Sequence, residues 1–263
     1  MKTIAIFNLK GGVAKTVTTV NLAAALAHDH GQRVLVVDAD SQANTTEFFG
    51  GTPEHGCLSK LLRYPSFEGN VSREAMLWAS VQTANYGGAL IDIIPGDDGL
   101  MDLDLSSVKS EAVDVTILRD VLRPSTRYDF VLIDCPPAFN AATAAGLLAA
   151  DEVIIPVKLD AFSLRGMGNL MRQIENIKRL NPRLTLRGVL PTMYYRSPEI
   201  ADALKMLRLH GMPVLALVPR SPRVDDMTFR QRPLLEVSPN CGACRAYRRL
   251  AGDLMRGGAD REL

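Results

Sequence analysis

The chain has 263 residues, 47% of them hydrophobic, and a formal net charge of +1. That length and content can bury a substantial core in one domain, while no run approaches the roughly 18 to 20 uninterrupted apolar residues of a membrane span. The N-terminal stretch shows no cleavable hydrophobic leader. The cysteines are too few and too scattered for a disulfide framework, so we expect a cytoplasmic protein with reduced thiols; they are Cys57, Cys135, Cys241 and Cys244.

The charge is distributed unevenly along the chain. Residues 1–182 carry 16 basic and 21 acidic side chains, whereas residues 183–263 carry 14 basic and 8 acidic ones. A basic C-terminal third suits a surface that meets nucleic acid or acidic lipid. A solvated basic face without a partner is the alternative.

Short apolar, β-branched runs alternate with amphipathic stretches. The runs predict buried strands at residues 3–8, 33–38, 90–95, 130–134, 152–157, 184–190 and 213–218. Apolar residues at three- and four-residue steps predict a helix over 163–180, with Ser163 as a candidate N-cap. The alternation indicates one α/β domain over 1–263, with a doubly wound, mostly parallel sheet and helices on both faces. Residues 50–88, rich in Gly, Pro and Ser, predict an irregular excursion with one or two short helices.

Three polar segments follow directly on predicted strands, after Asn8, Val37 and Ile133. Ligands of open parallel sheets bind beyond the carboxyl ends of the strands. We therefore expect these three segments to meet at one ligand site.

The first segment is Lys10-Gly-Gly-Val-Ala-Lys15-Thr16, between a strand and a helix that is predicted to begin near Thr16. In this context the loop N–H groups and the helix N-terminus both point at a bound phosphate. The strict pattern G-x-x-x-x-G-K-[ST] is not satisfied, because Leu9 and Ala14 stand at its glycine positions. Two lysines beside one tight turn repel each other unless an anion lies between them, which favours a phosphate site over a turn that binds nothing.

This segment resembles the deviant Walker A motif, KGG-x-x-K-[TS], of the ParA/MinD family of P-loop ATPases, whose fold is the SIMIBI-type P-loop NTPase fold. The resemblance implies ATP and Mg²⁺ as cofactors. It also implies that Lys15 holds the β- and γ-phosphates, that Thr16 ligates Mg²⁺, and that Lys10 reaches across a homodimer to the partner's nucleotide. The residues that it places at the nucleotide are Lys10, Gly11, Gly12, Val13, Ala14, Lys15, Thr16 and Val17, with Pro219 beside the adenine.

The other two segments are acidic. Residues 38–44 resemble the family's DxDPQ-x-N segment, with a serine in place of the proline, and residues 134–137 match its DxPP segment. The resemblance implies that Asp40 orients the attacking water, that Asp38 supports the magnesium shell and that Asp134 contacts Mg²⁺. Seen in isolation, such acids are also common in turns. The implied catalytic residues are Lys10, Lys15 and Asp40.

Similarity to the ParA branch continues through residues 191–196, 218–223 and 238–251. It implies an ATP-dependent homodimer that binds DNA without sequence preference through Arg196, Arg220 and Arg223. Such a protein partitions a plasmid, mobile element or chromosome origin, and a ParB-like DNA-binding partner stimulates its hydrolysis. It would be cytoplasmic, associated with the nucleoid when ATP is bound, and independent of membranes. DNA binding of this kind is directed at phosphates and depends strongly on salt.

Two other functions stay open. A MinD-like, membrane-associated regulator would need a C-terminal amphipathic helix with a strong apolar face, whereas glycines and acids interrupt residues 248–263. An iron-sulfur cluster carrier could use Cys241-Gly-Ala-Cys244 if a dimer brought two such pairs together. One CxxC pair is only half of a metal site, which favours structural thiols.

Overall fold

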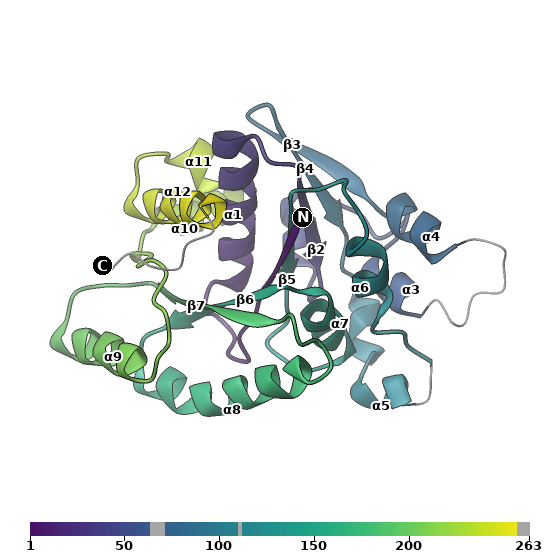
Figure 1. Ribbon diagram of the computed structural model, residues 1–263. Coiled ribbons are helices and arrows are strands. Elements are labelled where there is room, and N and C mark those ends of the chain that lie inside the picture. The colour runs from purple at the N-terminus through teal and green to yellow at the C-terminus, as the bar shows by residue number, and fades with distance from the viewer. Residues whose placement is uncertain (64–71, 110–111, 257–263) are drawn as a thin grey trace.

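The computed structural model describes residues 1–63, 72–109 and 112–256 of the chain. Its strands form a seven-stranded sheet in the order β3-β4-β2-β5-β1-β6-β7 (Figure 1). All neighbouring strands are parallel except the edge pair β3 and β4. The strands are β1 (Lys2–Ile6), β2 (Val34–Asp38), β3 (Gln82–Tyr86), β4 (Ala89–Ile94), β5 (Phe130–Asp134), β6 (Glu152–Lys158) and β7 (Thr185–Thr192). The predicted mostly parallel α/β architecture is confirmed.

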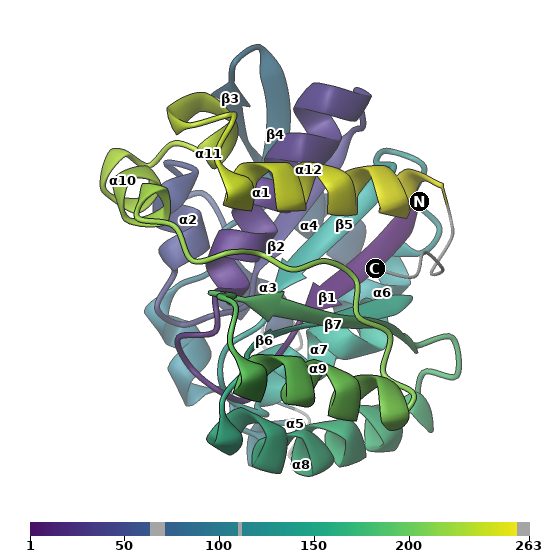
Figure 2. The same ribbon diagram turned by 90° about the vertical axis from the view of Figure 1, so that its left-hand side faces the viewer.

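Helices cover both faces of this sheet. Figure 2 shows α1 and α12 on one side of it and α8 and α9 on the other. The helices are α1 (Lys15–His30), α2 (Asn44–Phe48), α3 (Leu58–Leu62), α4 (Arg73–Ala79), α5 (Leu105–Lys109), α6 (Ile117–Leu122), α7 (Ala141–Ala149), α8 (Ala161–Lys178), α9 (Pro198–Leu209), α10 (Arg223–Arg230), α11 (Leu234–Val237) and α12 (Gly242–Met255), with a 3₁₀ turn η2 at Asp98–Asp102. No helix in these described ranges is long and apolar enough to cross a membrane.

Each central strand contributes side chains to two hydrophobic cores. In β5, Val131 and Ile133 pack on the face of α6 to α9, while Phe130 and Leu132 pack on the face of α1 and α12. This alternation follows from the two-residue period of a strand. Because both faces are covered, the strand reads in sequence as a continuous apolar run.

Helix α1 begins directly after the glycine-containing loop and is almost entirely buried over its first three turns. Its middle is rich in alanine and leucine, which favour helix formation. It ends at Gly31, whose left-handed backbone (φ 63°) lets its N–H donate to the carbonyl of Ala27. A long, buried helix thus fixes the loop that precedes it.

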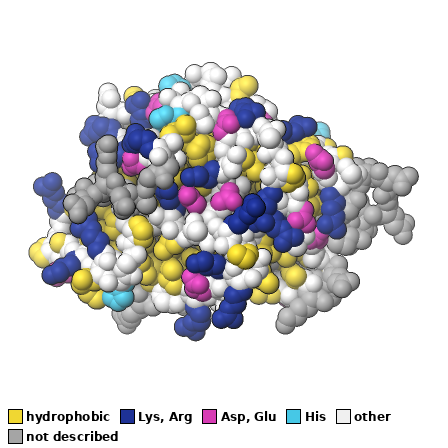
Figure 3. Space-filling view, in the orientation of Figure 1, with side chains coloured by type: hydrophobic (Ala, Val, Ile, Leu, Met, Phe, Trp, Pro, Cys, Tyr) yellow, Lys and Arg dark blue, Asp and Glu magenta, His cyan; other side chains and the backbone are white. Residues whose placement is uncertain are grey.

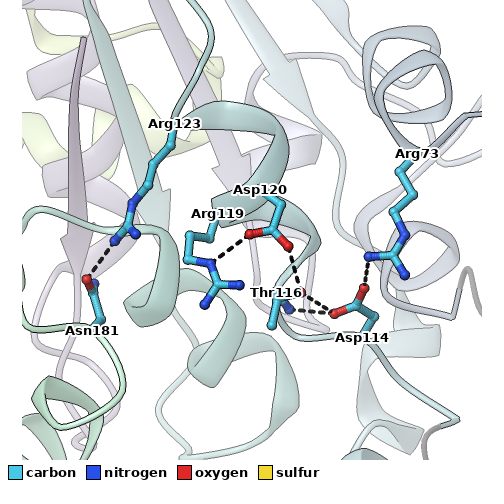
Figure 4. A network of polar contacts seen from close by, with 7 residues as sticks. All are labelled: Arg73, Asp114, Thr116, Arg119, Asp120, Arg123 and Asn181. Carbon is cyan, nitrogen blue, oxygen red and sulfur yellow. Dashed lines mark hydrogen bonds and ion pairs between the residues drawn. The ribbon is translucent and has the colours of Figure 1, made fainter.

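Polar contacts link the helices outside the central strands (Figure 4). Arg73 of α4 forms an ion pair with Asp114, which accepts hydrogen bonds from the N–H and hydroxyl of Thr116 at the start of α6. Arg123 donates to Asn181 Oδ1 at 2.6 Å, and the Asn181 amide donates to carbonyls at the end of α7. The first set of contacts joins α4 to the start of α6, and the second joins the end of α6 to α7, the helix that follows β5.

Three predicted elements differ from the structure. Residues 82–86, inside the predicted irregular excursion, form the edge strand β3. Residues 213–218 form no regular strand: isolated bridges join Val214 to Val189 and Pro219 to Tyr194, and Pro191 between them has no N–H to donate. Ser163 is not an N-cap, because α8 already begins at Ala161 after a turn in which the Asp160 N–H donates to the Lys158 carbonyl.

Candidate functional site

The loop between β1 and α1 turns through two left-handed residues, Gly12 (φ 67°) and Ala14 (φ 66°). The carbonyl of Ala14 accepts the first hydrogen bond of α1 from the Thr18 N–H, and the Lys15 ammonium donates to the carbonyl of Lys10 at 3.2 Å. Lys15 is therefore folded back over the loop. Burial lowers the pKa of Lys15, and the nearby carboxylates of Asp134 and Asp40 act in the opposite direction.

Asp38 and Asp134 end the adjacent strands β2 and β5 and are partners in the register of the sheet. Asp134 Oδ2 accepts hydrogen bonds from the hydroxyls of Thr16 (2.7 Å) and Thr45 (2.6 Å). Asp38 Oδ2 accepts from the N–H and the hydroxyl of Thr46, at 2.8 and 2.7 Å. The ends of two strands, the first residues of α1 and the start of α2 thus converge.

These two carboxylates are almost fully buried and close to each other. Burial, followed by the charge of Asp134, raises the pKa of Asp38 to about 7. Burial also raises the pKa of Asp134 to about 6, although the two hydroxyl donors oppose this. Asp134 Oδ1 is buried and accepts no hydrogen bond from the described residues. Two buried acids, a hydroxyl and an unsatisfied carboxylate oxygen form a donor set that suits a hard divalent cation.

Asp40 lies at the rim of the same cluster. Its N–H donates to Asp38 Oδ1 at 3.1 Å, and its carboxylate accepts the N–H of Gln42 at 3.1 Å. The carboxylate is close enough to act on the pKa values of both Lys15 and Asp134. It is half-buried, so it can reach a water molecule at the edge of a phosphate site.

Lys10 contacts an acid of its own subunit. Its ammonium lies 2.9 and 2.8 Å from the two carboxylate oxygens of Asp160, which follows β6. Both side chains are partly exposed, at 37% and 29%. Lys10 thus contacts a residue that follows β6, whereas Asp134 ends β5 on the other side of β1.

A cavity of about 570 Å³ lies on the C-terminal side of the loop. This volume is within the range of small-molecule sites. Tyr247 of α12 lines it, and its phenol is 3.2 Å from the hydroxyl of Thr18 in α1. The other residues around it are Ala14, Val17, Lys158, Thr192, Met193, Tyr195, Val218, Pro219, Arg220, Ser221, Pro222, Val224 and Asp225. The structure therefore brings Val17 and Pro219, far apart in the sequence, to one cavity beside the loop.

The three arginines assigned to DNA occupy neighbouring segments. Arg196, Arg220 and Arg223 are all exposed. The Arg220 N–H donates to the carbonyl of Tyr194, which joins the segments that carry Arg196 and Arg220. Arg220 also lines the cavity, whereas Arg223 begins α10 and forms an ion pair with Asp226 at 2.8 Å.

Several site residues escaped the sequence analysis. Thr45 and Thr46 hold the two buried acids, and Asp160 holds Lys10. Gly96 packs so closely that a Cβ would lie 2.8 Å from the carbonyl oxygen of Asp38, and its N–H donates to Thr46. Their position in the sequence could have indicated Gly96 and Asp160, because each follows a predicted strand, as Asp38 and Asp134 do.

Cysteines and histidines add no visible metal centre. Cys241 caps the N-terminus of α12, and the N–H of Cys244 donates to its sulfur at 3.3 Å. Within the part of the chain that the structure describes, no group of three or more His, Cys, Asp or Glu residues is arranged to hold a metal ion. The tail on which the membrane alternative depends ends in residues 257–263, which lie outside the described residues.

Comparison with known proteins places this geometry in a family. Residues 1–186 match the family described as an AAA domain. The chain is 34% identical over 269 residues to the chromosome partitioning protein ParA of Caulobacter vibrioides, covering 100% of this chain and 97% of that protein. It is 34% identical over 259 residues to the chromosome-partitioning ATPase Soj of Thermus thermophilus, covering 97% and 96%.

Solved structures agree with this placement. The cobyrinic acid a,c-diamide synthase of Mycobacterium smegmatis, with bound ADP and magnesium, superposes with a TM-score of 0.77 at 29% identity, over 97% of this chain and 94% of that one. The cell division ATPase MinD of Pyrococcus furiosus shares the fold, with a TM-score of 0.75 at 23% identity over 98% and 99%. On its sequence, its fold and its strand-end acids beside a two-lysine loop, the chain belongs to the ParA/MinD family of deviant Walker A P-loop ATPases.

Proposed function

We propose that this chain is a Mg²⁺-dependent ATPase that dimerises with ATP, binds DNA without sequence preference and partitions a replicon. The observation that carries the proposal is the convergence of Thr16, Asp38 and Asp134 beside Lys15, at the carboxyl edge of the sheet. Relatives named for chromosome partitioning cover nearly the whole chain. The M. smegmatis structure, which holds bound ADP and magnesium, supports the choice of ligands.

Each part of the site has a role in phosphoryl transfer to water, which depends mainly on positioning and charge neutralisation. Lys15 and the loop N–H groups bind the phosphates, and the N-terminus of α1 faces them. Thr16, Asp134 and Asp38 would hold Mg²⁺, which neutralises phosphate charge when bound. Because the cation offsets the cost of two buried carboxylates, it also favours their ionised state.

Asp40 is the proposed residue that orients the attacking water, since its carboxylate lies at the rim of this cluster near Lys15. The adenine base of ATP would occupy the cavity lined by Val17, Pro219 and Tyr247.

Mutation of Asp40 to Ala should preserve ATP binding and dimer formation but slow hydrolysis about a hundredfold. The rate of phosphate release tests this expectation, with Glu54→Ala, a substitution of an exposed acid outside the site, as the control. A wild-type rate of hydrolysis in Asp40→Ala would show that Asp40 does not orient the attacking water.

Dimerisation is proposed from Lys10. The lysine is partly exposed and is held by Asp160, a contact that its own subunit supplies. When two subunits meet across ATP, Lys10 would leave Asp160 for the phosphates of the partner's nucleotide. In the monomer, the ion pair with Asp160 thus fixes the position of Lys10, which would act in the dimer.

DNA binding is proposed for the exposed arginines Arg196, Arg220 and Arg223. On the face seen in Figure 3, basic side chains are interleaved with acidic ones and form no continuous patch. ATP-dependent dimerisation would bring together the arginines of two subunits and so enlarge the surface offered to DNA. A ParB-like partner would then trigger hydrolysis and release the protein from the nucleoid.

The test is retention of non-specific DNA by the protein with and without ATP and Mg²⁺. We expect retention only with nucleotide and a steep loss between 50 and 200 mM salt, since each phosphate contact releases counterions. Arg223→Ala should reduce retention at least fivefold while leaving ATP binding intact, and the matched control Arg172→Ala, an exposed arginine on α8, should not. Equal retention of DNA by the two variants would show that Arg223 is not part of the DNA-binding surface.

The alternative function, an iron-sulfur cluster carrier, has its own test. Absorbance near 400 nm after anaerobic purification would favour it.

A further inference from the structure

The first turn of α12 carries two thiols on either side of Gly242, which packs against Pro219 in the wall of the proposed adenine cavity. Cys241 is the N-cap residue and is half-buried, whereas Cys244 is 2% exposed. The sulfur of Cys241 accepts the N–H of Cys244 at 3.3 Å, so it already lies beside the backbone of its neighbour. This places the Cys241 sulfur next to the residue whose thiol it would join, and a disulfide needs Cα atoms roughly 4.4–6.8 Å apart, a spacing suited to two residues that flank one helical turn.

The same turn supports one wall of the cavity. Gly242 lies so close to Pro219 that a Cβ would be 2.9 Å from the proline Cγ. Pro219 lines the cavity, and so does Tyr247, which is on the next turn of α12. A change in the first turn of α12 therefore reaches Pro219 directly, because the packing leaves no space to absorb it.

We propose that Cys241 and Cys244 form a reversible intrachain disulfide, closed by a small disulfide oxidant such as oxidised glutathione, that weakens nucleotide binding through Gly242 and Pro219. The Cys241 thiolate attacks the oxidant, forms a mixed disulfide and releases one reduced thiol. The Cys244 thiolate then attacks the Cys241 sulfur, closes the ring and releases the second. The protein loses two electrons and two protons, and the oxidant is reduced to two thiols.

The position of each cysteine determines its part in this sequence. Cys241 is the more exposed of the two, so the oxidant meets it first. Burial raises the pKa of the Cys244 thiol to about 11, so ring closure should accelerate as the pH rises from 7 to 9. In closing, Cys241 exchanges its hydrogen bond with the Cys244 N–H for a covalent bond, which shifts the turn that seats Pro219.

The remaining cysteines provide an internal control. Cys57 and Cys135 are both 0% exposed and lie in other parts of the fold, at the start of α3 and after β5. Neither should react while the protein stays folded. Oxidation of the folded chain should therefore affect Cys241 and Cys244 alone.

The first experiment counts thiols in the full chain, purified with a reductant and a chelator and then treated with oxidised glutathione. We expect the count to fall from four to two, with an intact mass lower by two hydrogens and a cross-linked peptide that contains Cys241 and Cys244. Cys244→Ser should stop at a glutathione adduct on Cys241, and Cys241→Ser should keep all of its thiols. Four free thiols after treatment would overturn the proposal, and so would an adduct that never closes. A low thiol count that a chelator restores would show a metal on the pair and would also overturn it.

The second experiment measures the affinity for a non-hydrolysable ATP analogue in the reduced and oxidised states. We expect binding at least threefold weaker after oxidation, recovery with dithiothreitol, and no response to oxidant in the double variant Cys241→Ser/Cys244→Ser. Unchanged affinity in a protein whose disulfide has formed would refute the coupling to Pro219. If the reduced protein binds no nucleotide, the proposed function fails instead, and the thiol count remains a separate test of the disulfide.

Discussion

Ala14 adopts a backbone conformation that a Cβ disfavours. It is left-handed (φ 66°, ψ 38°) at the N-cap of α1, where the strict phosphate-loop pattern has glycine. A residue with a Cβ loses about 1–2 kcal/mol in this region, and glycine loses about 0.4–1 kcal/mol more chain entropy on folding. Ala14→Gly should therefore raise the free energy of unfolding by about 0.5–1 kcal/mol, measured by urea denaturation.

A matched substitution separates this effect from glycine entropy alone. Ala201 is exposed within α9, a regular helix, and Ala201→Gly should destabilise the protein by about 1 kcal/mol. A gain in the free energy of unfolding in Ala14→Gly and a loss in Ala201→Gly would show that the backbone of Ala14 is strained. A loss of stability in Ala14→Gly would mean that the loop does not hold Ala14 in the left-handed region.

At the scale of elements, Arg33 and Asp129 pair the entries of β2 and β5. The Arg33 guanidinium donates to both carboxylate oxygens and its N–H to one of them, which lowers the pKa of Asp129 to about 2. A carboxyl whose pKa is lower in the folded state stabilises the fold above pH 4, and this contribution disappears as the pH falls from about 4 to about 2. The pair is exposed to solvent, so its contribution is about 0.5–1 kcal/mol.

Asp129→Asn should therefore reduce the free energy of unfolding by about 0.5–1 kcal/mol at pH 7 and by less at pH 3. Urea unfolding of the wild type and of Asp129→Asn at pH 7, 5 and 3 measures this difference in the free energy of unfolding. Glu54→Gln, a neutralised exposed carboxyl, corrects for the change of net charge. A gap that is constant over this pH range would show that the ion pair contributes nothing.

Strands that are buried on both faces were predicted from their apolar runs, whereas the largely polar edge strand was missed. β5 matches its predicted range, because a continuous apolar run records burial on two sides. The edge strand β3 is largely polar, yet Gly87 and Gly88 both have positive φ (59° and 88°) in the two-residue turn to β4. Two glycines between short runs are typical of a hairpin, so a local signal for β3 was present.

The candidate site divides in the same way. The loop, Asp38 and Asp134 could be predicted, because each follows an apolar run at a strand end. The hydroxyl of Thr45 could not, because Thr45 and Asp134 are 89 positions apart and meet only through the strand order β2-β5. Tyr247 likewise meets Thr18 across 229 positions, because α12 packs against α1.

For the whole molecule, the ion pair between Lys10 and Asp160 would link the state of one subunit to assembly of the proposed dimer. If Lys10 leaves Asp160 in the dimer, weakening the pair in the monomer shifts the equilibrium towards the dimer. A partly exposed pair contributes about 0.2–1 kcal/mol, which corresponds to a shift of up to about fivefold for each subunit. Asp160→Asn should therefore form dimers at a lower protein concentration when ATP is present.

Sedimentation of wild type and Asp160→Asn over a range of concentrations measures this shift, in the Asp40→Ala background so that hydrolysis does not deplete the dimer. Lys10→Ala should lose the ATP-dependent dimer in either background, and Glu175→Gln, an exposed carboxyl on α8, should behave as wild type. A weaker dimer in Asp160→Asn would mean that Asp160 continues to position Lys10 after assembly. The carboxylate of Asp160 would then belong to the dimer interface, together with the Lys10 ammonium that it holds.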